Sequence, residues 1–126
     1  MRLSIEVSPG EAADKLTILR IKQDRIRDPA KLAHIGREAE MLEAALAPLR
    51  QRFPAILPLI EELRRVNEAL WDVEDALRLH EKRGDFGDEF VRLARSVYVT
   101  NDRRAAVKAE INRILGSDIA EQKSYA

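Results

Sequence analysis

The chain has 126 residues, of which 45% are hydrophobic, and this excludes a disordered protein because one domain of that size can build a core. Its 22 basic residues balance its 22 acidic ones, so the charge excess of a dedicated nucleic-acid binder is absent. The chain has no cysteine and no apolar run near ~18 residues, which excludes disulfides, thiolate zinc sites and membrane insertion by a helix.

The first predicted elements are a short extended segment and a helix. Residues 3–7 alternate apolar and polar side chains but are too few for a stable strand, so we expect residues 1–7 to be extended. In "SPGE" at residues 8–11, the serine suits a helix cap, the proline the first position and the glutamate a capping box. Asp28-Pro29 should end this helix and begin the next.

The second helix has the clearest periodicity, with apolar residues in alternating steps of three and four, as in a coiled-coil-like hairpin. These residues are Leu32, Ile35, Ala39, Leu42, Leu46, Leu49 and Phe53. Either Pro54 or Pro58 should open a third helix that runs to about Arg83.

A loop and a fourth helix complete the pattern. Within "RGDFGD" at residues 83–88, Gly84 suits a helix end, and Asp85 or Asp88 suits a new cap. The fourth helix should end at Gly116, before a tail over residues 117–126 that has no clear period.

The third and fourth helices would each have about 25–30 residues, or ~40 Å of length. Helices this long in a small chain usually pack as antiparallel hairpins. We therefore predict an all-α fold, a single domain over residues 1–126, with about four helices in an antiparallel bundle or a pair of hairpins. Exposed apolar flanks on such helices favour a homodimer.

The apolar stripe of the fourth helix turns polar at Asn101 and Arg104. In a hairpin around residues 84–87, residues whose numbers sum to about 171 lie level with each other. Trp71 would then face Asn101, and Asn67 would face Arg104. The predicted polar cluster contains Asn67, Trp71, Glu74, Asp75, Arg95, Tyr98, Asn101 and Arg104, with Asp14 and Lys15 of the first helix as candidates to join it.

Two interpretations of this cluster remain open. It can be a buried network whose members satisfy one another and fix the helix register. It can also be a ligand cleft, because an indole, a phenol, guanidinium groups and carboxylates can hold a sugar, a nucleotide or a phosphate.

Catalytic and metal-binding patterns are weak in this sequence. Glu74 and Asp75 are adjacent, so on a helix they point about 100° apart and do not converge. Neither His34 nor His80 has the glutamate three positions earlier that a helical di-iron site needs. A glycine-rich phosphate loop is also missing. We predict no catalytic residue, no metal and no cofactor.

Several segments together resemble a bacterial domain family of unknown function. They are residues 8–26 (SPGEAADKLTILRIKQDRI), 70–81 (LWDVEDALRLHE), 93–112 (LARSVYVTNDRRAAVKAEIN) and 121–125 (EQKSY). The signature letters of that family in this chain are Asp14, Lys15, Trp71, Glu74, Asp75, Arg95, Tyr98, Asn101, Asp102 and Lys108. Related segments occur near glycosyltransferase-like proteins, so the resemblance implies an accessory role in glycan or polysaccharide synthesis.

The sequence therefore favours a non-enzymatic interaction or ligand-binding module in the bacterial cytoplasm. Its expected partners are a second copy of the chain and a protein of glycan synthesis, with no nucleic acid and no membrane insertion. The alternative is a small helical enzyme that acts on an anionic metabolite or nucleotide sugar. In that case Arg95 and Arg104 would clamp the charge, and Glu74 would be the base.

Overall fold

A computed structural model describes residues 1–119 and confirms the all-α fold. Within these residues there is no strand, and residues 1–7 are exposed and lie outside any helix. No helix in this part of the chain combines the length and apolar character needed to cross a membrane. The elements are α1 (Pro9–Arg25), α2 (Pro29–Arg52), the short 3-10 turn η1 (Pro54–Ile56), α3 (Leu57–Arg83) and α4 (Asp88–Ile114).

The helix boundaries follow from local capping chemistry. The Ser8 hydroxyl accepts a hydrogen bond from the Glu11 backbone N–H at 3.2 Å, as the sequence predicts. The Asp28 side chain accepts from the backbone N–H of Ala30 at 2.9 Å and begins α2 in the same way. At the end of α3, Gly84 adopts a left-handed conformation with φ of 64°, which closes the helix without strain on a side chain.

The predicted cap of α4 is wrong. Gly87 occupies the N-cap position, and no side chain there accepts a hydrogen bond from the helix. Asp88 is instead the first helical residue, and the Asp85 carboxylate accepts from the Gly87 N–H at 3.2 Å. The loop therefore uses Asp85 to shape its own turn, and α4 begins with acidic residues that suit its positive end.

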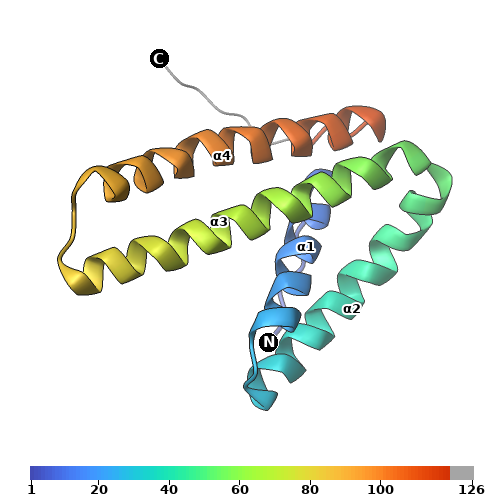
Figure 1. Ribbon diagram of the computed structural model, residues 1–126. Coiled ribbons are helices and arrows are strands. Elements are labelled where there is room, and N and C mark those ends of the chain that lie inside the picture. Colours follow the sequence, from blue (N-terminus) through green and yellow to red (C-terminus); the bar gives the residue numbers. More distant parts are fainter. Residues whose placement is uncertain (120–126) are drawn as a thin grey trace.

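The helices form two antiparallel hairpins, α1–α2 and α3–α4, that run in different directions from a shared junction (Figure 1). At the junction, α1 packs on the first half of α3 and the second half of α4. The buried apolar core lies here and extends between α1 and α2. Its members are Ala13, Leu16, Leu19, Ile35, Ala39, Leu46, Ile56, Leu63, Val107 and Ile111.

The far half of the α3–α4 hairpin extends beyond α1 and α2, and we call residues 70–83 and 88–101 the distal arm (Figure 1). None of these residues is buried. At the base of the arm, residues 70–75 lie beside α1. Farther out, within residues 1–119, the two helices extend away from α1 and α2 and contact each other (Figure 1).

Candidate functional site

The polar break in α4 meets a buried carboxylate from α1. Asp14 is only 1% exposed, and Arg104 binds it in a bidentate way, with Nε to Oδ1 at 2.9 Å and Nη2 to Oδ2 at 2.5 Å. Asn67 of α3 donates to Asp14 Oδ1 and to the Thr17 hydroxyl, both at 2.9 Å. The Thr17 hydroxyl donates to the Asp14 carbonyl at 2.7 Å. This network joins α1, α3 and α4, and its hydrogen bonds and charge pairing offset the cost of burying a carboxylate.

A second group of contacts joins the start of α1 to the end of α4. The ammonium group of Lys108 lies 2.6 Å from the Glu11 carboxylate and 4.0 Å from Asp14. The Gly10 backbone N–H donates to Asn112 Oδ1 at 2.8 Å, a contact between residues 102 positions apart. We call the Gly10–Asn112 contact the terminal clasp, since it ties the first turn of α1 to the last turns of α4.

A groove of about 460 Å³ lies beside the buried network, between α1 and the α3–α4 hairpin. Its walls combine aliphatic side chains with one indole, two amides, two carboxylates and two guanidinium groups. The lining residues are Ile18, Ile21, Asn67, Leu70, Trp71, Glu74, Asp75, Arg78, Asn101 and Arg104.

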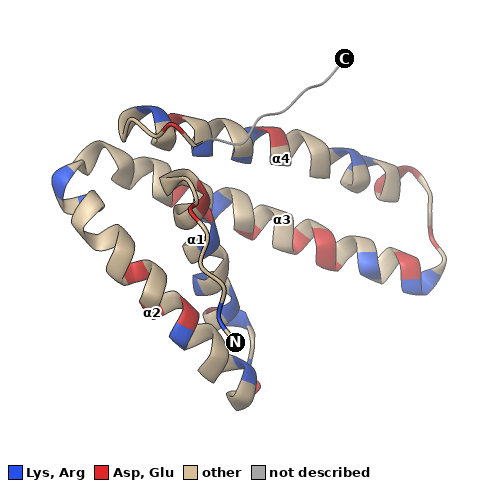
Figure 2. Cartoon of the chain, turned by 180° about the vertical axis from the view of Figure 1, so that it is seen from behind, with Lys and Arg blue, Asp and Glu red and all other residues tan. Residues whose placement is uncertain are grey.

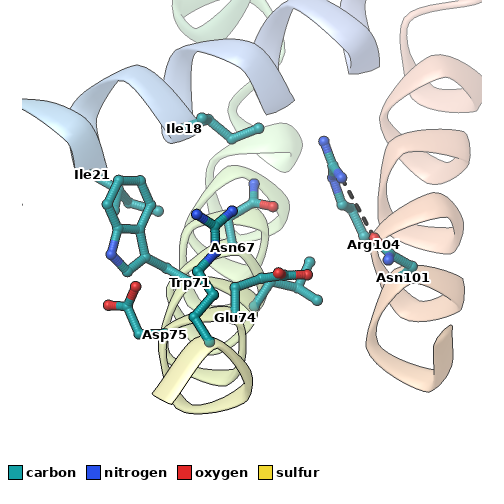
Figure 3. A pocket seen from close by; sticks show the side chains of 10 residues that line it. Ile18, Ile21, Asn67, Trp71, Glu74, Asp75, Asn101 and Arg104 are labelled. Atoms are coloured by element: carbon teal, nitrogen blue, oxygen red, sulfur yellow. Dashed lines mark hydrogen bonds between the residues drawn. The ribbon is translucent and has the colours of Figure 1, made fainter. Parts of the chain in front are cut away.

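The lining side chains approach the groove from two sides of α3 (Figure 3). Glu74 points from α3 toward Asn101 and Arg104 on the facing helix. Trp71 and Asp75 lie on the other side, next to Ile21 of α1. The groove thus has a polar wall between α3 and α4 and an aromatic wall between α3 and α1.

A guanidinium group from α1 packs against the indole ring of the aromatic wall. The Arg25 guanidinium lies 5.7 Å from the centre of the Trp71 ring, within the range of a cation–π contact. Arg25 also donates to Asp72 at 2.5 Å, and this hydrogen bond raises the pKa of Arg25 above its ordinary value. Because Arg25 stays charged and paired, it holds the indole plane in place beside the groove.

The structure brings most of the predicted cluster together. Asn67 and Arg104 meet at Asp14, which agrees with the register predicted from the hairpin. The prediction that Trp71 faces Asn101 is wrong, because the indole lies on the α1 side of α3 and Asn101 lies on the facing helix (Figure 3). Asn67 and Arg104 also line the groove, together with Trp71, Glu74, Asp75 and Asn101.

Three predicted members lie elsewhere. Lys15 points away from the network and forms an ion pair at 2.5 Å with Glu38 of α2. Arg95 and Tyr98 are exposed, do not line the groove, and contact each other at 3.3 Å. Register sets the height of a residue along a helix, but the direction of its side chain depends on how the helix is rotated, and these residues project from other faces.

The sequence analysis did not place several residues that the site uses. No sequence pattern marks Thr17 or Asn112 as a member of the site, because both lie within regular helical segments. Lys108 appeared only among the signature letters of the resembling family. Ile18 and Ile21 widen the apolar side of the first helix beyond one stripe, and this sequence feature could have indicated the aliphatic walls.

Two polar residues of the groove, Glu74 and Arg104, differ in their partners within residues 1–119. The Glu74 side chain makes no hydrogen bond within residues 1–119, so no second residue orients it as a base. The Arg104 guanidinium is already matched by Asp14. In the same described part, no three His, Asp or Glu side chains come together as a metal-ligand set.

Comparison with known proteins identifies one match. A family model described as a family of unknown function, DUF6165, matches residues 3–126. No curated protein and no solved structure matches the chain.

Proposed function

The chain belongs to the DUF6165 family, and we propose that this member is a non-enzymatic binding module whose groove holds a neutral saccharide. The observation that carries the proposal is the combination of Trp71 with amide and carboxylate groups in one groove. The negative face of an aromatic ring attracts the weakly positive C–H groups of a sugar ring. Planar amides, carboxylates and guanidinium groups satisfy neighbouring sugar hydroxyls with paired hydrogen bonds.

The charge of the groove favours a neutral ligand over an anionic one. Arg104 is matched by the buried Asp14, so Arg78 is the one lining guanidinium whose charge is not paired within the described residues. The groove also has two lining carboxylates, those of Glu74 and Asp75. A phosphate or diphosphate would meet this excess of negative charge, whereas sugar hydroxyls can donate to the same carboxylates.

The same geometry weighs against the enzyme alternative. A charge clamp made of Arg95 and Arg104 needs both groups at one site, but Arg95 does not line the groove. Glu74 has no orienting partner among residues 1–119. We therefore assign the groove to recognition and not to chemical conversion.

We further propose that this recognition serves glycan assembly in the bacterial cytoplasm, with a protein of that pathway as a partner. The resemblance of residues 8–26, 70–81 and 93–112 to segments found near glycosyltransferase-like proteins supports this setting. A small module that holds a saccharide could present it to such an enzyme.

The chain has a single tryptophan, which lines the groove, so its emission at fixed protein concentration gives a direct test of ligand binding. Neutral oligosaccharides titrated at fixed protein concentration should change the Trp71 emission in a saturable way. Glu74→Gln removes the charge that strengthens a hydrogen bond from a sugar hydroxyl, and Asn101→Ala removes a hydrogen-bond partner, so each should weaken binding about 3- to 10-fold.

Tyr98→Ala is the matched control, since it removes an exposed aromatic ring outside the groove and should leave the affinity unchanged. If no saccharide changes the Trp71 emission, and none perturbs backbone amide resonances around the groove, the proposal is wrong. Equal loss of affinity in Tyr98→Ala and Asn101→Ala would also contradict it.

A further inference from the structure

The distal arm exposes more apolar surface than a two-helix hairpin can cover. Phe86 at its tip is 52% exposed, and Val91, Tyr98 and Val99 on α4 and Leu79 on α3 are exposed to a similar extent. Helices in proteins are stabilised mainly by packing an apolar face, and monomers rarely leave a continuous apolar patch uncovered. Something should therefore pack against the arm.

The order of charged residues along α3 indicates which partner packs against the arm. In the arm, α3 carries the acidic residues Glu74 and Asp75 nearer its base and the basic residues Lys82 and Arg83 nearer its tip. Figure 2 shows acidic residues in the middle of α3 and basic residues at its loop end. Within residues 1–119, none of these four side chains makes an ion pair or a hydrogen bond. A helix that is acidic in one half and basic in the other complements a second copy of itself lying antiparallel.

One face of α3 carries this pattern. Trp71, Asp75, Arg78 and Lys82 follow steps of four, three and four, so they share a stripe of the helix, as in a coiled-coil seam. Figure 3 shows Trp71 and Asp75 on the same side of α3. The stripe runs from the groove toward the tip of the arm, so a helix packed along it would also reach the groove.

We propose that a second copy of this chain docks on the arm with its α3 antiparallel to the first α3, about a two-fold axis between Arg78 and Leu79. Asp75 then faces the partner subunit's Lys82, and by the two-fold symmetry Lys82 faces the partner subunit's Asp75. The same register sets the partner subunit's Phe86 level with Trp71. The interface uses the same patch on both copies, so every contact occurs twice.

The remaining charges of the stripe agree with this register. Arg78 lies close to the axis, and the partner subunit's Glu81 is within about half a turn of it along the helices. The paired arms would place four helices side by side, with Leu79 of each copy level with the two-fold axis. The tip of the second copy would enter the corner between α1 and α3 and complete the aromatic wall of the groove.

The dimer does not depend on the saccharide proposal, because its test contains no ligand. The molar mass of the purified chain is measured by light scattering and sedimentation over a wide concentration range. We expect the wild type to approach twice 14.4 kDa as the concentration rises. Asp75→Lys and Lys82→Asp should each place like charges together twice and raise the dimer dissociation constant at least about tenfold.

Two combinations of these charge variants test the register of the proposed dimer. The double variant Asp75→Lys/Lys82→Asp should dimerise again, because both charges are exchanged. An equimolar mixture of the two single variants should form heterodimers for the same reason. Glu40→Lys is the matched control, since this exposed residue of α2 lies outside the arm and its reversal should leave the mass unchanged.

Phe86→Ala tests the apolar contact at the tip. It should weaken the dimer, and the dilution-dependent change in Trp71 emission that we expect of the wild type should disappear. A wild type that remains monomeric at every concentration overturns the proposal. So does a dimer that keeps its affinity in both single charge variants, or a mixture of those variants that fails to associate.

Discussion

At the scale of single residues, the polar groups of the fourth helix have a physical explanation. Asn101 and Arg104 interrupt an apolar stripe because Arg104 must reach Asp14, which is buried on α1. The sequence allowed the level of Asn67 and Arg104 to be predicted, since both lie on long helices joined by a short loop. It did not reveal the role of Asn112, which depends on how closely α1 approaches α4.

That close approach makes Gly10 a sensitive position. A Cβ atom there would lie 2.5 Å from the Lys108 carbonyl oxygen and 2.9 Å from Asn112 Oδ1. The carbonyl belongs to a helix backbone and cannot rotate away, so Gly10→Ala should push α1 off α4. We expect a loss of about 2 kcal/mol in the free energy of unfolding, measured by urea denaturation.

Gly36 provides the control for this substitution. A Cβ atom at Gly36 in α2 would have nothing within 4 Å, so Gly36→Ala adds a methyl group without a clash. Alanine favours a helix more than glycine does, and the protein should gain up to about 1 kcal/mol. Similar effects of the two substitutions would show that the clasp is looser than the structure indicates.

At the scale of elements, periodicity and capping predicted the four helices because each helix carries its own signals. Pro58 begins α3 within its first two positions, and Gly84 ends it. The 3-10 turn at Pro54–Ile56 was not predicted, since three residues are too few to show a period. The cap of α4 was predicted wrongly because Asp85 and Asp88 are both plausible caps in sequence, and the loop geometry decides between them.

The structure also predicts a gradient of stability along α3. Leu63 is fully buried at the junction, so Leu63→Ala should cost about 3 kcal/mol through lost contacts and a cavity. Leu77 in the arm is half-buried, so Leu77→Ala should cost less than about 1.5 kcal/mol. Both values should be measured by denaturation at the lowest practical concentration. Equal losses would contradict the division of α3 into a core half and an exposed half.

At the scale of the whole molecule, the directions of the two hairpins were not predictable from sequence. Helix lengths and loops indicate that α1 pairs with α2 and α3 with α4. The angle between the pairs depends on packing at the junction, where Leu63 and Ile111 meet the first helix pair. The groove lies at this angle, so its position could be found only from the structure, although most of its polar residues were predicted.

The difference in stability between the buried junction and the exposed distal arm should be visible in hydrogen exchange of the whole chain. Amides of residues 57–67 and 107–114 lie at the junction and should open less often than those of residues 70–83 and 88–101. We expect protection factors at least about tenfold higher at the junction at low concentration. Uniform protection along α3 at low concentration would show that the arm is stabilised by something within the monomer.

The terminal clasp has a consequence for how the protein is made. Gly10 bonds to a residue 102 positions later, and Asp14 to one 90 positions later. During synthesis, the carboxylate of α1 has no guanidinium partner until most of the chain has left the ribosome. Closing so long a loop costs entropy and slows folding. Both hairpins have local contacts, so each should assemble before the long-range contacts form, and the docking of α1 on α3 and α4 should be the last step.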